Sequence, residues 1–321
     1  SQITLPVDGN AQKSSQVRIE GIAVAPAGVS RVEVSPDGGG TWFYATGTRI
    51  WSHDWTAPGD GSYTIISRAV DGDDQIETPG AGVTVTVDSN LPTTTGTLPE
   101  DETWSGTVAL TGDVTVPAGM TLTISAGTQI EFVPLSDDQG GGGNTSRGEL
   151  IVNGSLHAAG SAGSPIVFTS GAPTPSKGDW YGIRVRPSGN GTQVVLEHCT
   201  VEYAMLGVAV NTNGYDTDIR IGDSTIHHTS GNGIGIEAGG GAKVSINIDA
   251  NTVTDNDGQG IYLSGTDADT AIEGIISANT VHANGGNGIY LYPRNRGGGD
   301  VRVSGNTVYD NSNNGIYLYV D

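Results

Sequence analysis

The stretch "NTVTDNDGQGIYLSG" (residues 251–265) recurs twice, with few changes, further along the chain. The later copies are "NTVHANGGNGIYLYP" (residues 279–293) and "NTVYDNSNNGIYLYV" (residues 306–320). Their first residues are 28 and 27 positions apart, a period that is typical of repeats that stack into solenoids. Each copy holds an Asn, an aliphatic residue two positions later, and a Gly that opens a short aliphatic strand. The stretch therefore predicts a repeat architecture built from strands.

The same period continues upstream of these copies. Two further aliphatic columns, which begin at Leu196 and Val201, recur with this period. The glycines that open the strands recur with it as well; they are Gly182, Gly207, Gly233, Gly260, Gly288 and Gly315. Three aliphatic columns at one period imply three strand faces in each coil. We therefore predict a three-faced parallel β-helix of eight or nine coils over residues 103–321. The glycine-rich stretch 135–148 is expected to bulge from it as a loop.

Residues 1–90 follow a different pattern. Short alternating strands such as "QVRIEGIAVA" and "SYTIISRAVD" are separated by turn signals, among them Pro36-Asp37-Gly38. This pattern predicts an Ig-like β-sandwich with Trp42, Trp51 and Trp55 in its core. Residues 91–102, rich in Pro and Thr, are predicted to be a short stiff linker. No window has the periodicity of an amphipathic helix, so the predicted fold class is all-β.

Both regions resemble known families at the residues quoted. The three copies are similar to the right-handed parallel β-helix repeat of the pectate-lyase-like superfold and to NosD/CASH-type repeats of carbohydrate-binding and surface proteins. "GVSRVEVSPDGGGTW" and "GSYTIISRAVDGDDQIE" resemble bacterial Ig-like or fibronectin-like modules. The superfold hosts lyases, hydrolases, epimerases, adhesins and inert fibres, so the resemblance implies a fold and leaves the function open.

The composition is acidic, with 35 Asp and Glu against 14 Lys and Arg and a formal net charge of −21. Such a surface repels phosphate backbones and anionic membranes, which argues against nucleic-acid binding. No apolar run is long enough to span a membrane. We expect a secreted or cell-surface protein, whose "SQITLPVDGN" could be a mature N-terminus after signal cleavage. The single cysteine, Cys199, is expected to be buried and inert.

No cofactor is predicted, although Ca²⁺ binding by the acidic turns stays open. These turns are "DGDD" (71–74), "DTD" (216–218) and "DAD" (267–269), and none matches a known calcium motif. Aspartates in turns commonly cap backbone groups instead. Two Asn columns, beginning at Asn251 and Asn256, are predicted to form buried hydrogen-bonded ladders between coils.

Tyrosines fill the outward positions of the repeated strands. Strand alternation places five of them in two exposed columns, Tyr262, Tyr290 and Tyr317 beside Tyr292 and Tyr319. One interpretation is cross-strand stabilisation, and the other is a binding surface for sugar rings or for another protein. These five residues are the candidate binding site.

No catalytic or metal cluster is predicted. The outward column Glu202, His227, Thr254, His282 and Tyr309 holds one carboxylate, and no compact acidic group is seen beside Arg184 and Arg186. The neighbours His227 and His228 should point to opposite faces and so should not share a metal ion. The sequence thus leans against an enzyme. If the protein is one, the resemblance favours a polysaccharide lyase or glycoside hydrolase.

The first hypothesis for function is a structural or adhesive protein. Its partners would be further copies of itself or another surface protein, and no nucleic acid. The strand near residue 317 would leave an open edge, explained by a truncated chain, a missing cap or a neighbouring subunit that pairs head to tail into fibres. The alternatives are a carbohydrate-binding module that uses the tyrosines and a polysaccharide-cleaving enzyme.

Overall fold

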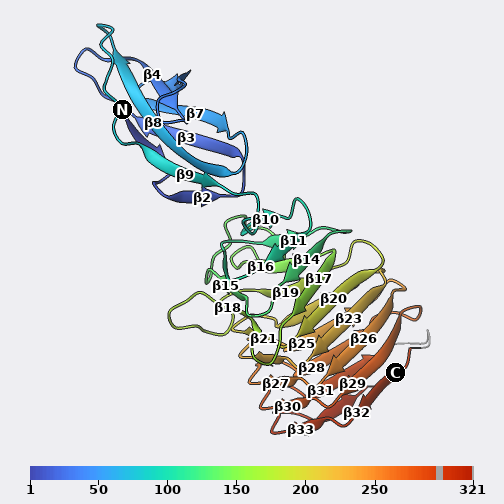
Figure 1. Ribbon diagram of the computed structural model, residues 1–321. Coiled ribbons are helices and arrows are strands. Elements are labelled where there is room, and N and C mark those ends of the chain that lie inside the picture. The colour runs from blue at the N-terminus through green and yellow to red at the C-terminus, as the bar shows by residue number, and fades with distance from the viewer. Residues whose placement is uncertain (294–298, 320–321) are drawn as a thin grey trace. The chain divides into compact units, whose positions relative to one another are not determined.

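The computed structural model describes residues 1–293 and 299–319, in which every regular element is a β-strand. The chain divides into two compact units, Ser1–Leu91 and Pro92–Asp321 (Figure 1). The prediction of an all-β protein is confirmed.

The N-terminal unit has two sheets around one core. The first has the order β1-β3-β7-β6 and the second the order β2-β9-β8-β4-β5. The strands are β1 (Gln2–Leu5), β2 (Asn10–Gln12), β3 (Gln16–Ile22), β4 (Val29–Ser35), β5 (Phe43–Tyr44), β6 (Thr46–Gly47), β7 (Ile50–Thr56), β8 (Gly61–Asp71) and β9 (Val83–Val87). If β1, β3, β4, β6, β7, β8 and β9 are named A to G, the sheets have the A-B-E-D and G-F-C orders of the predicted Ig-like sandwich, with β2 and β5 at the two edges of the second sheet.

The two sheets bury a common set of aliphatic side chains, among them Ile19 of β3, Val34 of β4 and Ile65 of β8. Trp51 is fully buried with them. Trp55 is half-buried and packs against this core, with its ring edge against Tyr63. The predicted core position of Trp42 needs correction, because its half-exposed ring is covered by the Arg68 guanidinium at 3.9 Å instead. A cation over the ring lets Trp42 remain near solvent.

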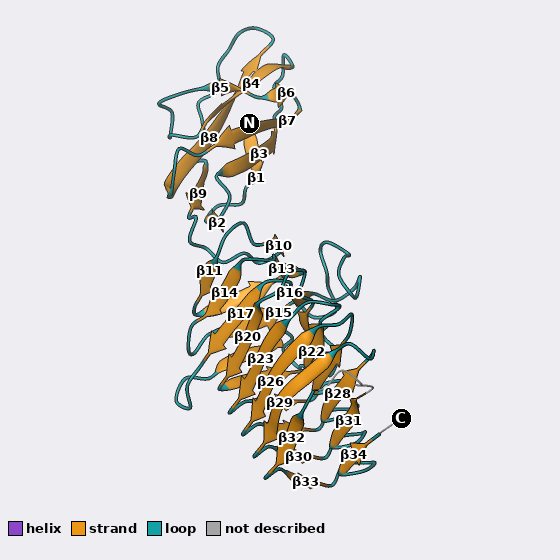
Figure 2. Ribbon diagram, turned by 90° about the vertical axis from the view of Figure 1, so that its right-hand side faces the viewer, coloured by secondary structure: helices purple, strands orange, loops and turns teal. Residues whose placement is uncertain are grey.

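The C-terminal unit is a stack of coils in which each strand pairs in parallel with the strand three elements later (Figure 2). This pairing creates three parallel sheets, as predicted. Sheet 1 has nine strands, β10 (Gly96–Thr97), β13 (Val114–Val116), β16 (Glu149–Val152), β19 (Gly182–Val185), β22 (Val208–Asn211), β25 (Ile234–Ala238), β28 (Ile261–Gly265), β31 (Ile289–Pro293) and β34 (Ile316–Leu318).

Sheets 2 and 3 have eight strands each. Sheet 2 contains β11 (Glu102–Trp104), β14 (Thr121–Ile124), β17 (Ser155–Ala159), β20 (Thr192–Glu197), β23 (Thr217–Gly222), β26 (Lys243–Asp249), β29 (Ala271–Ser277) and β32 (Val301–Ser304). Sheet 3 contains β12 (Thr107–Leu110), β15 (Gln129–Phe132), β18 (Ile166–Ser170), β21 (Cys199–Glu202), β24 (Thr225–His227), β27 (Thr252–Thr254), β30 (Thr280–His282) and β33 (Thr307–Tyr309).

One hydrophobic core runs through all the coils because each strand turns alternate residues inward. In β26, for example, Val244, Ile246 and Ile248 are buried while the residues between them face outward. The core begins earlier than expected. Within residues 91–102, interpreted above as a linker, β10 already pairs with β13 and Leu98 is buried in the core of the coils.

The predicted Asn ladders are confirmed. Asn251 Nδ2 donates to Asn279 Oδ1 at 3.0 Å, and Asn279 Nδ2 donates to Asn306 Oδ1 at 2.9 Å. The second ladder joins Asn256, Asn284 and Asn311 through two bonds of 2.9 Å. Cys199 is buried beside the start of the first ladder, and burial raises the pKa of its thiol to about 12, which leaves it unreactive.

The last described coil has exposed apolar side chains. Ile316 and Leu318 of β34 are 51% and 57% exposed, although their counterparts in earlier coils are buried. Residues 294–298, Val320 and Asp321 lie outside the described residues.

Candidate functional site

The outward face of sheet 1 carries two lines of side chains in register. Cross-strand pairing aligns Arg184, Ala209, Gly235, Tyr262, Tyr290 and Tyr317 on consecutive coils. A second line, one step along each strand, holds Asn211, Glu237, Ser264 and Tyr292. The structure thus brings the five predicted tyrosines to one face of one sheet.

The tyrosines of the first line stack on one another. The ring centroids of Tyr262 and Tyr290 are 5.4 Å apart, and those of Tyr290 and Tyr317 are 5.2 Å apart, with interplanar angles of 25° and 20°. These separations barely exceed the ~4.8 Å spacing between strands, so the rings face one another along the stack. Tyr292 and Tyr319 meet edge to face at 4.8 Å. Consequently the inner ring faces of the stack are already covered by tyrosine.

One face of Tyr262 is different, because the stack ends there. The preceding coils place Gly235 and Ala209 in the same line, where large side chains would otherwise continue it. They leave a hollow of about 140 Å³, hereafter the trough, whose lining includes Arg184, Ala209, Asn211, Asn232, Gly235, Glu237 and Tyr262. The trough thus offers an aromatic ring, a guanidinium, a carboxylate and two amides around a small-residue floor.

Two buried acids, Glu149 and Asp113, lie behind the Arg184 side of the trough: Glu149 is next to Arg184, and Asp113 is next to Glu149. Glu149 Oε2 lies 3.6 Å from Arg184 Nη1, and the Tyr181 ring lies 4.8 Å from the guanidinium carbon. The Asp113 carboxylate accepts the Glu149 backbone N–H at 3.0 Å. Arg184 Nη1 is buried, and no hydrogen-bond partner for it is found among residues 1–293 and 299–319. Because this nitrogen is buried beside Glu149, a ligand in the trough cannot reach it.

The glycine-rich loop, as predicted, bulges from the coils, and it covers the acids. A Cβ at Gly142 would lie 2.0 Å from Glu149 Oε1 and 2.5 Å from Asp113 Oδ2, which places these two oxygens at most 4.5 Å apart. A Cβ at Gly143 would lie 2.6 Å from Arg184 Nη1. Only glycine permits so close an approach. Because the loop covers both carboxylates, a substrate cannot contact them. Their role is to position Arg184, which lies beside Glu149.

This acidic group corrects the expectation that Arg184 has no carboxylates beside it. Asp113 and Glu149 belong to coils separated by the glycine-rich insertion, which breaks the period used to align the repeats. A signal did exist, because the register pairs Glu149 with Gly182, two residues before Arg184.

A second correction concerns His227 and His228. They lie on sheet 3, and their Nδ1 atoms are 2.5 Å apart, so the two rings do not point to opposite faces. His228 follows the end of β24 and has a left-handed φ of 54°, which turns its side chain toward His227.

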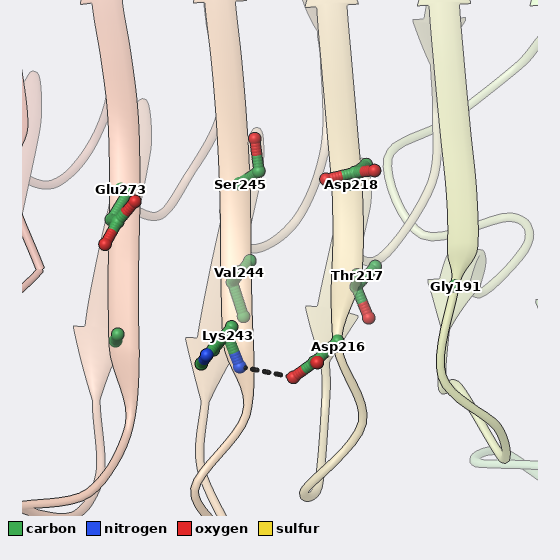
Figure 3. A pocket seen from close by; sticks show the side chains of 9 residues that line it. Gly191, Asp216, Thr217, Asp218, Lys243, Val244, Ser245 and Glu273 are labelled. Atoms are coloured by element: carbon green, nitrogen blue, oxygen red, sulfur yellow. Dashed lines mark hydrogen bonds between the residues drawn. The ribbon is translucent and has the colours of Figure 1, made fainter.

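The acidic turns mostly hold backbone groups. Asp71 Oδ1 accepts the N–H groups of Asp73 and Gln75, and Asp267 Oδ1 accepts the Thr270 hydroxyl at 2.6 Å. Figure 3 shows a groove of about 270 Å³ on sheet 2, where Asp216 accepts the Lys243 backbone N–H at 2.8 Å. Within the described part of the chain, no three His, Cys, Asp or Glu residues are arranged to hold a metal ion. Ca²⁺ binding stays a prediction.

Two family descriptions match the coils. "Right handed beta helix region" matches residues 174–321, and "Pectate-lyase like beta helix domain" matches residues 96–206. The C-terminal unit is a right-handed parallel β-helix. The prediction made from the repeats is therefore confirmed, and the trough lies on the outer face of one of the three sheets of the β-helix.

The other comparisons add less. No curated protein matches the chain. A solved structure of fibronectin(III)-like modules of Clostridium thermocellum CbhA is 22% identical and covers 27% of this chain and 94% of its own, with a TM-score of 0.25. The Ig-like assignment rests on the strand order described above. The described residues contain no helix of the length and apolarity that a membrane crossing needs.

Proposed function

We propose that this is an extracellular or cell-surface protein that binds a carbohydrate chain along sheet 1 of its β-helix. The observation that carries the proposal is the open face of Tyr262, which looks onto the trough. Sugar rings present apolar C–H faces that stack on aromatic rings, while their hydroxyl groups need donors and acceptors nearby. The trough supplies both.

The polar groups around the trough suit a ligand with many hydroxyl groups. The Asn211 and Asn232 amides can donate and accept, the Glu237 carboxylate accepts, and the Arg184 guanidinium adds a positive charge. The volume of about 140 Å³ is well below the ~300–1,000 Å³ of drug-sized pockets, so the trough would hold one ring of a longer chain. The edges and hydroxyls of Tyr290, Tyr292, Tyr317 and Tyr319 would line the path beyond it.

A glycan array tests this proposal. Removing the ring with Tyr262→Ala should weaken binding by at least about tenfold, or ~1.4 kcal/mol, because the stacking platform is lost. Tyr309→Ala is the matched control, since Tyr309 is 45% exposed but lies on sheet 3. If the wild-type protein binds no neutral or acidic glycan, or if both variants bind as it does, the proposal fails.

Head-to-tail assembly of several copies stays a prediction of the sequence. Sedimentation velocity over a wide concentration range decides this point: a single monomeric species throughout rejects assembly.

A further inference from the structure

His227 and His228 form a two-imidazole pair on sheet 3, a different sheet from that of the trough. Their Nδ1 atoms are 2.5 Å apart, which is hydrogen-bond distance. In such a hydrogen bond, one proton fills the place between the two nitrogens. A metal ion can fill it as well, because each nitrogen can offer it a lone pair.

The surroundings of His227 fix which nitrogen is free. Glu202 Oε2 lies 3.2 Å from His227 Nε2, on the side of the ring away from His228. Glu202 Oε1 accepts the Thr169 hydroxyl at 2.8 Å, which orients the carboxylate. A carboxylate at this distance accepts a hydrogen bond from the ring nitrogen. The proton of His227 is therefore assigned to Nε2, and its Nδ1 carries a lone pair.

A carboxylate behind a histidine ring is the usual support of a metal-bound histidine. It fixes the tautomer and makes the ligating nitrogen more basic. The His227 side chain is 19% exposed, so an ion can reach it from solvent. A Zn–N distance of about 2.0–2.1 Å at a tetrahedral angle places two nitrogens about 3.3 Å apart, so the rings need to separate by less than about 1 Å.

We propose that His227 and His228 bind a divalent late transition-metal ion, Zn²⁺ or Cu²⁺, through their Nδ1 atoms, with Glu202 as the positioning residue. Water would complete the coordination, since the described chain offers no third His, Cys, Asp or Glu in place. Imidazole nitrogens suit these ions, whereas Ca²⁺ and Mg²⁺ prefer oxygen ligands.

Isothermal titration of the full chain, prepared without a polyhistidine tag, tests the site with ZnCl₂ and CuSO₄. One ion should bind per chain, and CaCl₂ at the same concentrations should not compete with it. His228→Asn should weaken binding by at least about tenfold; Asn tolerates the left-handed backbone of this position. Glu202→Gln should weaken it by about 10–100-fold, the usual effect of losing such a support.

His282→Ala is the matched control. His282 lies in the same outward column of sheet 3, but its ring stacks on Tyr309 at 4.7 Å, and within residues 1–293 and 299–319 it has no carboxylate behind it. Its replacement should leave binding unchanged. Absence of Zn²⁺ and Cu²⁺ binding by the wild type, or equal affinity in the wild type, His228→Asn and Glu202→Gln, would overturn the proposal. The pair would then be a simple hydrogen bond.

Discussion

At the scale of residues, burial changes the pKa values of the two acids near Arg184, Asp113 and Glu149. Burial, and then the neighbouring Glu149, raise the pKa of Asp113 to about 7. Burial likewise raises the pKa of Glu149. Below about pH 7 the protonated form of Asp113 avoids two adjacent negative charges under the loop, while Glu149 remains near the Arg184 guanidinium. The support of the trough therefore depends on a carboxyl group that is protonated more readily than usual.

The stability of the protein should reflect this pair. Because the folded-state pKa of Asp113 is raised, its contribution to stability is fully present below its ordinary pKa near 3.8 and is lost as the pH rises toward about 7. Asp113→Asn keeps the neutral form at every pH. We expect the variant to gain stability relative to the wild type between pH 5 and pH 8.

Urea unfolding at pH 5 and at pH 8 measures the difference in unfolding free energy between Asp113→Asn and the wild type. Asp218→Asn, an exposed change on sheet 2, serves as the control and should show the same pH dependence as the wild type. A difference between wild type and Asp113→Asn that does not vary with pH would contradict this account of Asp113.

At the scale of elements, the corners of the coils are held by side chains rather than by strand pairing. Asn279 is fully buried. Its Nδ2 donates to the Ile248 carbonyl at 2.9 Å, and its Oδ1 accepts the Asn251 backbone N–H at 2.9 Å. The residue before it, Ala278, has a left-handed φ of 53°, a conformation that costs free energy in a non-glycine residue. The Asn ladder offsets this cost once per coil.

Breaking one ladder should therefore cost more than an ordinary polar substitution. Asn279→Ala leaves the Asn251 N–H and the Ile248 carbonyl buried without partners, each worth about 1–3 kcal/mol, so we expect a loss of about 2–4 kcal/mol in the free energy of unfolding. Asn313→Ala, at an exposed position, should change it by less than about 0.5 kcal/mol. Equal unfolding free energies for the two variants, measured in urea, would show that the ladder does not stabilise the corner.

At the scale of the whole chain, periodicity was enough to predict the architecture. The three parallel sheets, the Asn ladders and the tyrosine columns all follow from a period that survives in the sequence. Features that interrupt the period could not be predicted. The first strand of the β-helix lies in a Pro- and Thr-rich stretch that has no periodic pattern. The glycine-rich insertion separates Asp113 from Glu149 in the sequence, so their contact could not be predicted. Strand alternation also could not predict the left-handed backbone of His228, which turns its ring toward His227.

The trough was missed for another reason. It exists because Ala209 and Gly235 have almost no side chain, and a small residue becomes informative only when its neighbours across the sheet are known. The predicted tyrosines lie on the same sheet face as the trough, but their stacking covers most of their ring faces. Their binding role stays a prediction that now centres on Tyr262.

The most direct test is the dissociation constant of Gly235→Val for the glycan that the wild-type protein selects. A Cβ at Gly235 would meet only Asn232, at 3.7 Å, and Val is favoured in strands, so the change should fill the trough without disturbing the fold. Ser245→Val on sheet 2 is the matched control. We predict at least about a tenfold rise in the dissociation constant for Gly235→Val and none for Ser245→Val. An unchanged dissociation constant in a folded Gly235→Val protein would contradict a sugar site in the trough.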